Sequence, residues 1–389
     1  MKKLFLPFVC LFVISFANAQ ENVITTAVPF LLVAADARAA GMGDQGVATS
    51  ADTYSQQWNP AKYAFAIDKQ GFSVSYTPYL TDLVNDISLG QLTYYNRIDE
   101  KSAFAGSFRF FGLGNIELRE TGDPNEVPRI VSPSEFAFDG SYSLKLSEKF
   151  SMAVGARYIT SSLKVADATG DASSASTFAV DVAGFYQSEE LAFENFNGRW
   201  RAGFNLQNMG PKMSYDNTEF SSNFLPANMR LGGGFDFILD DYNKVSVNLE
   251  FAKLLVPTPQ NPDLNQDGTV TAAERNQNNE NYRSIGWFSG ITQSFSDAPG
   301  GFSEELKEFT YSLSTEYLYQ DSFSLRAGYF HENPDKGARQ FFSLGAGFKY
   351  NVVKVDVSYL FSTSKVKNPL ENTLRFSLTF NFGDKYDEY

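Results

Sequence analysis

Segments of about ten residues in which apolar and polar side chains alternate recur along this chain, and no other feature constrains its fold as strongly. In the segment 372–382, apolar residues occupy every second position from Leu374 onward, with polar residues between them. The segments 353–362, 308–320 and 244–254 follow the same pattern. A period of two predicts β-strands with one face in an apolar environment and the other in a polar one.

A soluble β-sandwich also alternates, so strand length has to decide between the two environments. Strands of soluble proteins are typically about 5–6 residues long, whereas a tilted strand needs about 9–11 residues to cross the hydrocarbon of a bilayer. The segments of this chain have the longer span. Aromatic residues make up 15% of the chain, yet its mean hydropathy is −0.26. This combination is typical of membrane barrels, in which only alternate residues face lipid and aromatic belts mark both interfaces.

The pattern predicts an all-β fold, a transmembrane antiparallel β-barrel of about fourteen strands in the outer membrane. Short and long connectors alternate, and short turns belong on the periplasmic side, so both termini are expected in the periplasm. Because lipid cannot satisfy an open sheet edge, the last strand should pair with the first. The expected strands are 70–79, 86–98, 101–112, 135–146, 151–163, 176–187, 199–209, 228–238, 244–254, 308–320, 322–332, 340–350, 353–362 and 372–382.

The first residues have the composition of an export signal. Two lysines precede an apolar run, and Ala17-Asn18-Ala19 is a small-residue cleavage site, so we expect residues 1–19 to be a signal peptide. The apolar run is shorter than the roughly 20 residues of a membrane-spanning helix. Cys10, the only cysteine, lies within it, so the mature chain is expected to hold no disulfide.

Residues 20–69 do not alternate, and they are too many for a simple tail. Because fourteen strands enclose a lumen wider than their side chains can fill, we expect this segment to fold into the barrel as a plug or hatch. A periplasmic extension is the alternative. The barrel is then expected at 70–382, with a long extracellular loop at 255–307 and a periplasmic tail at 383–389. Inward charges of this kind usually pair with each other or with a plug, and lining a pore is the alternative. They are those of Asp139, Lys145, Asp181, Arg230, Glu250, Glu316, Arg326, Asp356 and Arg375.

The charge and the histidine count exclude two classes of function. The net charge is −13, and it is two units more negative without the two lysines of the leader, whereas a general nucleic-acid binder needs a basic face. His331 is the only histidine, so Ser-His or Cys-His catalysis has one possible base, and metal sites built from His and Cys are excluded by count. We expect His331 to be a solvated loop residue, and we predict no catalytic residues and no enzymatic activity.

Residues 263–274 match the spacing of a twelve-residue EF-hand calcium loop, including a glycine at its sixth position. Prolines at 257, 259 and 262 preclude a regular entering helix, so a polar loop without a metal is the alternative. A filled site would stiffen the 255–307 loop, which is a candidate docking surface. The predicted Ca²⁺ ligands are Asp263, Asn265, Asp267, Thr269 through its carbonyl, Thr271 through a water, and Glu274 with two oxygens.

Further along the same loop, four apolar residues have the spacing of a short amphipathic helix, namely Trp287, Phe288, Ile291 and Phe295. This helix is expected to pack on the barrel rim, and the alternative is that it offers an apolar patch to a partner.

The stretch Gly41-Met42-Gly43-Asp44-Gln45-Gly46 matches the dinucleotide fingerprint G-x-G-x-x-G. That motif requires a βαβ unit with a later acidic residue on a second strand, and no such strand follows here. We interpret these glycines as positions where the plug packs tightly against the barrel wall.

The same glycines, together with Trp58-Asn59-Pro60-Ala61, resemble the start of FadL-like outer-membrane barrels of Bacteroidetes. With Asn208-Met209-Gly210-Pro211-Lys212, the chain is similar to the PorV (LptO) family of the type IX secretion system. The resemblance implies a shuttle or adaptor that binds the giant translocon barrel (SprA/Sov-like) and the C-terminal signal domain of secreted cargo. It further implies delivery of that cargo to the sortase-like PorU at the surface. A FadL-type channel for hydrophobic small molecules is the alternative function, and a general porin is the third.

Overall fold

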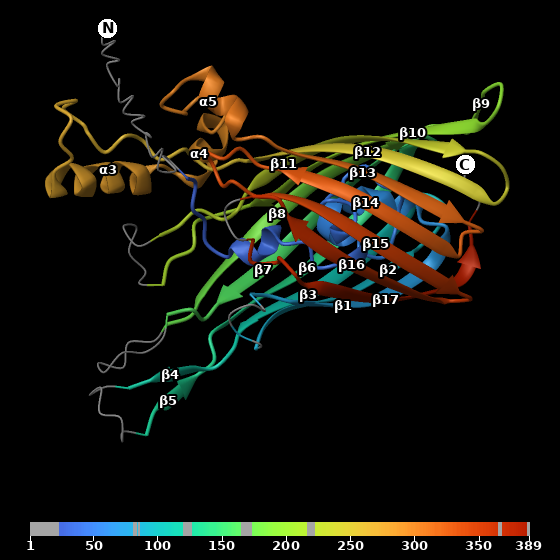
Figure 1. The fold of residues 1–389 in the computed structure, drawn as a ribbon, viewed down its shortest axis with the longest axis horizontal. Helices are drawn as coiled ribbons and strands as arrows, with labels where there is room; N and C mark the ends of the chain where they lie inside the picture. Colours follow the sequence, from blue (N-terminus) through green and yellow to red (C-terminus); the bar gives the residue numbers. More distant parts are fainter. Residues whose placement is uncertain are drawn as a thin grey trace, which may run out of the picture.

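The computed structural model describes residues 23–80, 84, 86–119, 127–164, 173–215, 222–364 and 368–386, which form a β-barrel with an N-terminal segment inside it (Figure 1). The predicted signal peptide lies outside the described residues. Every helix in the described part of the chain is too short or too polar to span a bilayer.

A ring of antiparallel strands closes on itself. The 15-stranded sheet consists of this ring and of the two-residue strand β9 (Leu191–Ala192), which extends β10, so the ring has fourteen strands. β17 pairs with β1 and β10 with β11, which leaves no free edge among the ring's described strands. The ring comprises β1 (Asp68–Pro78), β2 (Ile87–Arg97), β3 (Ser102–Leu113), β6 (Ser134–Ser147), β7 (Phe150–Ser161), β8 (Ala175–Gln187), β10 (Asn197–Met209), β11 (Asn228–Ile238), β12 (Asn243–Leu254), β13 (Thr310–Tyr319), β14 (Phe323–His331), β15 (Gln340–Tyr350), β16 (Val353–Ser362) and β17 (Leu374–Lys385).

Each predicted strand coincides with one strand of the ring to within a few residues, and the predicted closure is confirmed. The alternation has the expected cause. On β17, Leu374 and Phe376 are each 45% exposed, whereas Arg375 between them is 1% exposed. The apolar face therefore points outward toward lipid and the polar face points into the lumen, as in outer-membrane barrels.

Short turns and long loops lie at opposite ends of the barrel (Figure 1). The long-loop end carries the helices α3 (Ala272–Ser284), α4 (Trp287–Gln293) and α5 (Phe302–Lys307). It also carries a hairpin of β4 (Ile116–Leu118) and β5 (Arg129–Val131) that the sequence analysis did not predict. The helix predicted from the spacing of Trp287, Phe288, Ile291 and Phe295 is present as α4, which ends at Gln293 and leaves Phe295 just beyond it.

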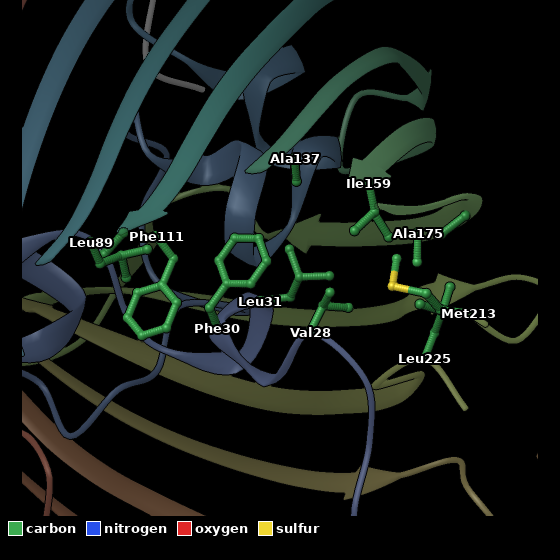
Figure 2. Close-up of a cluster of buried hydrophobic side chains, with 12 residues drawn as sticks. Val28, Phe30, Leu31, Leu89, Phe111, Ala137, Ile159, Ala175, Met213 and Leu225 are labelled. Atoms are coloured by element: carbon green, nitrogen blue, oxygen red, sulfur yellow. The ribbon is translucent and has the colours of Figure 1, made fainter. Parts of the chain in front are cut away.

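The lumen segment, residues 23–67, contains η1 (Pro29–Leu32), α1 (Ala37–Ala40), α2 (Ser55–Trp58) and η2 (Pro60–Phe65). Its first part packs in the half of the lumen nearest the long loops, where Phe30 and Leu31 join a buried cluster with Phe111 of β3 (Figure 2). Burial of these apolar side chains is the main non-directional force that holds this part of the segment in the barrel.

The two ends of the described chain lie at opposite ends of the barrel. The Ala27 amide donates to the Phe224 carbonyl in a long loop at 2.8 Å, and the Tyr386 amide donates to the Ile67 carbonyl at the short-turn end at 2.8 Å. The described chain therefore begins and ends on different sides, because the lumen segment runs lengthwise through the barrel before β1 begins. The first and last residues lie outside the described part of the chain, so the periplasmic location of both termini stays a prediction.

Candidate functional site

The glycines of the G-x-G-x-x-G stretch pack the lumen segment against the wall. A Cβ added to Gly41 would lie 2.9 Å from the Gly345 Cα of β15, and one added to Gly43 would lie 2.9 Å from the Tyr329 carbonyl oxygen of β14. Gly43 also has a φ of +73°, which disfavours any other residue. The structure thus agrees with the interpretation of these glycines as packing positions.

Buried ion pairs join the lumen segment to the barrel wall. Arg38 Nη2 lies 2.8 Å from Glu316 Oε2, and Arg38 Nη1 lies 2.7 Å from Asp52 Oδ2. Glu316 also pairs with Arg326 at 2.7 Å, and Arg326 pairs with Asp356 at 2.7 Å. Removing one member of such a network leaves a buried charge without compensation, so the network favours one position of the segment.

Glu250 of β12 makes a second attachment through the backbone of the segment. Its Oε2 accepts hydrogen bonds from the amides of Gly46 at 2.8 Å and Val47 at 2.9 Å. Its Oε1 pairs with Arg230 of β11 at 2.7 Å. A carboxylate that accepts two backbone N–H groups forms charge-assisted hydrogen bonds, which are stronger than neutral ones.

The remaining predicted inward charges also find partners. Arg157 of β7 lies between Asp139 at 3.1 Å and Asp181 at 3.0 Å, and Arg375 of β17 pairs with Asp44 of the lumen segment at 3.0 Å. The Lys145 ammonium lies 4.5 Å from the centre of the Phe65 ring. The predicted pairing of inward charges with each other and with the segment is therefore observed.

Sequence reasoning missed two arginines that hold the segment. Arg109 of β3 donates to the carbonyls of Leu31 at 2.9 Å and Val33 at 2.7 Å, and Arg201 of β10 donates to the Ala48 carbonyl at 3.0 Å. Their inward positions could have been read from the period of two. Their partners could not, because backbone carbonyls carry no sequence signal.

A polar cavity of about 270 Å³ remains in the lumen at the short-turn end. Its lining includes Asp52, Tyr54, Glu316 and Lys354. Arg38, Glu316 and Asp356 of the ion-pair network also line the cavity, so the cavity adjoins the lumen segment.

The loop crown comprises residues 255–307 and the neighbouring loops 210–215, 222–227 and 332–339 at the long-loop end. A buried charge cluster anchors it, in which Lys253 at the end of β12 pairs with Glu305 of α5 at 3.2 Å and with Glu308. Lys336 of the β14–β15 loop pairs with Glu308 at 3.1 Å. The cluster ties three separate elements together, so the crown has a defined arrangement at the rim.

Within the crown, helix α3 packs on the start of its own loop and on the neighbouring loop 222–227. The Tyr282 hydroxyl of α3 donates to the Pro257 carbonyl at 3.0 Å, and the Tyr282 ring lies 5.5 Å from the Phe224 ring. Burial raises the pKa of Tyr282 above its ordinary value. Gly290 of α4 lies so close to Pro257 that an added Cβ would be 2.9 Å from it.

Helix α4 therefore packs on the rim through its glycine while large apolar side chains of the crown stay exposed. These crown apolar residues are Phe288 (66% exposed), Phe295 (49%), Phe302 (77%) and Leu306 (55%). The expected packing of this helix on the rim is thus observed, and the alternative that it offers an apolar patch to a partner stays a prediction.

The predicted calcium loop is exposed and organised by its own side chains. Asp263 accepts hydrogen bonds from the amides of Asp267 at 3.2 Å and Gly268 at 2.9 Å, and Asn265 Oδ1 accepts from the Asp267 amide at 2.9 Å. Gly268 has a φ of +83°, as a sharp turn requires. The hydrogen bonds thus bring Asp263, Asn265 and Asp267 together at the start of the loop.

Glu274 has a second role at the other end of that loop. It forms a reciprocal capping box with Thr271 at the start of α3, and its Oε2 accepts from the Thr271 amide at 2.9 Å. The hydrogen bonds from Thr271 lower the pKa of Glu274. Within the described residues, no group of three or more His, Cys, Asp or Glu side chains converges in a metal-binding geometry.

His331 lies at the end of β14, not in a loop. Its ring stacks on Tyr311 with 4.7 Å between ring centres, and its Nδ1 lies 3.3 Å from the Tyr329 hydroxyl. The aromatic neighbours account for this histidine as a packing residue.

One protein family matches the sequence of this chain. The family model described as the type IX secretion system protein PorV matches residues 16–261. The comparison with curated proteins found no match.

Several solved structures share the fold. A deltaS2S3 mutant of the monoaromatic hydrocarbon channel TodX has a TM-score of 0.52 at 12% identity, over 89% of this chain and 98% of that chain. The toluene transporter TodX of P. putida has a TM-score of 0.50 at 11% identity, over 88% and 97%. A FadL homologue of Pseudomonas aeruginosa has a TM-score of 0.44 at 12% identity, over 93% and 100%. At these identities the likeness concerns the fold alone. The chain belongs to the PorV family of type IX secretion system proteins and shares the outer-membrane β-barrel fold of the TodX structures.

Proposed function

We propose that this protein is an adaptor of the type IX secretion system that binds the translocon barrel and the C-terminal signal domain of secreted cargo. It then delivers the cargo to the sortase-like attachment complex at the surface. The observation that carries this proposal is the segment that occupies the lumen of a PorV-family barrel, in which Arg38, Glu250 and Arg375 are committed to holding it. Such a barrel is better suited to docking proteins than to passing solutes.

In this proposal the lumen segment acts as a plug and the loop crown acts as the docking surface. The segment's attachments reach around the barrel, from Arg109 of β3 to Arg375 of β17. The crown combines a rigid charge cluster with exposed aromatic side chains, and exposed aromatic residues are enriched where proteins bind one another. Rigid anchoring lowers the entropy that a binding surface loses on association.

Affinity purification of the tagged protein from native membranes tests the adaptor role. We expect the translocon barrel and several cargo proteins with C-terminal signal domains to be recovered with it. A tagged outer-membrane barrel outside the secretion system serves as the control for membrane carry-over. Recovery of the same proteins with both baits, or of neither translocon nor cargo with this one, would contradict the proposal.

A channel for hydrophobic small molecules is the second candidate, and the fold shared with the TodX structures favours it. Under this alternative the lumen segment would move during transport. A channel should restore uptake of a hydrophobic nutrient to a deletion strain whether or not the secretion system is present. An adaptor should restore surface display of cargo only when the system is present.

We also propose that residues 263–274 bind Ca²⁺. The support is the match of all six ligand positions together with the turn that Asp263 and Gly268 form. Asp263, Asn265, Asp267, Thr269, Thr271 and Glu274 would hold the ion. Binding would stiffen the long loop of the crown without any catalytic role.

A further inference from the structure

An apolar groove of about 800 Å³ runs along the outer face of three adjacent strands, β10, β11 and β12. Its walls are formed by the side chains of Trp200, Leu231, Phe235, Leu249 and Phe251, and its floor lies at Gly233. Every side chain that lines it is aliphatic or aromatic. The groove therefore offers mainly dispersion contacts to an occupant, and the indole N–H of Trp200 is the single hydrogen-bonding group among its lining side chains.

The groove opens outward and not into the lumen. Trp200 is 54% exposed while its neighbour Arg201 is 2% exposed, and Leu249 is 40% exposed while Glu250 is 3% exposed. The period of two thus places the groove on the face that the barrel presents to lipid. It is continuous with the apolar belt of the barrel.

The hollow exists because Gly233 carries no side chain, and the protein itself does not require a glycine there. An added Cβ would meet only the Arg201 carbonyl oxygen, at 3.8 Å. The neighbouring glycines differ, since a Cβ on Gly232 would lie 2.6 Å from Val47 and one on Gly234 would lie 2.5 Å from Asn248. Those two glycines make room for inward groups, whereas Gly233 makes room for something outside the barrel.

Along β11 the groove extends from Phe237, near the short-turn end, past the middle of the strand to Leu231. From Leu231 to Phe237 the strand advances roughly 20 Å, which at a strand tilt of about 40° is roughly 15 Å of membrane depth. That depth is half of the about 30 Å of bilayer hydrocarbon, or one leaflet. Short turns lie on the periplasmic side of bacterial barrels, so the leaflet is the periplasmic one.

Aromatic side chains close the groove at its periplasmic end. Phe193 and Phe196, in the connector that contains β9, have ring centres 4.9 Å apart, and Phe196 lies 5.4 Å from Phe237. This connector joins β8 to β10 and is longer than the other connectors at the short-turn end. Its length lets two phenylalanines reach back onto the outer face of β11.

We propose that the groove binds one acyl chain of a phospholipid from the periplasmic leaflet. The groove's length matches one leaflet, its lining is almost wholly apolar, and the surrounding solvent is hydrocarbon. An extended polypeptide in this position would bring backbone N–H and C=O groups that find no partner there. This lipid site is independent of the adaptor role, so either can fail without the other.

Native mass spectrometry of the full-length protein, titrated with palmitoyl-oleoyl-phosphatidylethanolamine in detergent, tests the site. We expect one lipid to be retained, and we expect Gly233→Leu to weaken retention about tenfold, as loss of contact with roughly two methylene groups implies. Gly140→Leu is the matched control, because Gly140 lies on the outer face of β6 and an added Cβ meets only the Ala105 carbonyl oxygen at 3.8 Å. Equal retention by the Gly233→Leu and Gly140→Leu variants, or no retention by the unmodified protein, overturns the proposal.

Quenching of Trp200 by a brominated phosphatidylethanolamine tests the site without altering Gly233. The chain has three tryptophans, so the difference in fluorescence between the unmodified protein and Trp200→Phe isolates this one. The vesicles consist of phosphatidylcholine with a small mole fraction of the brominated lipid. We expect Trp200 to lose more fluorescence than random contact with lipid of that composition would cause. Quenching that only follows the fraction of brominated lipid means that the groove has no preferred occupant, and this result overturns the proposal.

Discussion

Arg38 of the lumen segment and Glu316 of β13 form a buried ion pair with 2.8 Å between Nη2 and Oε2. The two side chains are 278 residues apart in the chain, and each is less than a tenth exposed. Their pairing joins the lumen segment to the barrel wall. Glu316 also neutralises Arg326, so one carboxylate holds two arginines in place.

Replacing Glu316 by Gln should destabilise the position of the lumen segment. Removing one partner of an isolated buried ion pair typically costs about 3–5 kcal/mol. The loss here should lie at the lower end of that range, because Arg38 keeps Asp52 as a partner and Arg326 keeps Asp356. We expect a lower Tm and a measurable ion conductance in planar bilayers. Asp384→Asn is the control, since the partner of Asp384 is Lys69 at the surface, and it should change neither quantity. An unchanged Tm and conductance in Glu316→Gln would show that the pair does not hold the segment.

Gly43→Ala should lower the stability of the folded barrel. The new Cβ would lie 2.9 Å from the Tyr329 carbonyl oxygen at a φ of +73°, and such strain costs about 1–3 kcal/mol. Thermal unfolding followed by heat-modifiable gel mobility measures the effect. Gly286→Ala should behave like the unmodified protein, because no atom lies within 4 Å of an added Cβ at Gly286. Equal unfolding temperatures for the two variants would refute the packing role of Gly43.

Lys253→Met should loosen the loop crown while the barrel remains intact. The change leaves Glu305 buried without its cation and Glu308 with Lys336 alone. We therefore expect faster proteolysis within 255–307 and little change in barrel unfolding. Lys307→Gln removes an exposed ion pair with Asp335 and should leave the cleavage rate unchanged. If both variants are cleaved at the same rate as the unmodified protein, the cluster does not anchor the crown.

Asp263→Ala/Glu274→Ala should abolish Ca²⁺ binding to the long loop. Titration calorimetry of the unmodified protein should give one site, and Ca²⁺ should slow proteolysis of 255–307. Glu280→Ala on the exposed surface of α3 controls for a general loss of negative charge. Equal binding by the double variant and the unmodified protein, or binding by neither, excludes the site.

The barrel could be predicted from sequence because each strand has one face in lipid and one in the lumen. Apolar and polar residues therefore alternate with a period of two along every strand. The strands β4 and β5 escaped prediction because three residues are too few to show a period. The course of the lumen segment could not be derived, since Arg109 and Arg201 hold it through backbone carbonyls.

The functional surfaces were predictable only in part. The spacing around Trp287 indicated the helix α4, but the charge cluster of Lys253, Glu308 and Lys336 unites three distant segments that no local pattern connects. The outer groove likewise depends on one missing side chain at Gly233 between neighbours from three strands. Such sites exist only once the ring has closed.

Site-specific photo-crosslinking in living cells tests the docking role of the crown most directly. A photo-reactive residue at Phe302, which is 77% exposed, is compared with one at Tyr142 on the lipid face of β6, which is 45% exposed. We predict adducts with the translocon barrel or with cargo signal domains at position 302 and none at 142. Absence of protein adducts at 302, in cells that still secrete cargo, would contradict the account.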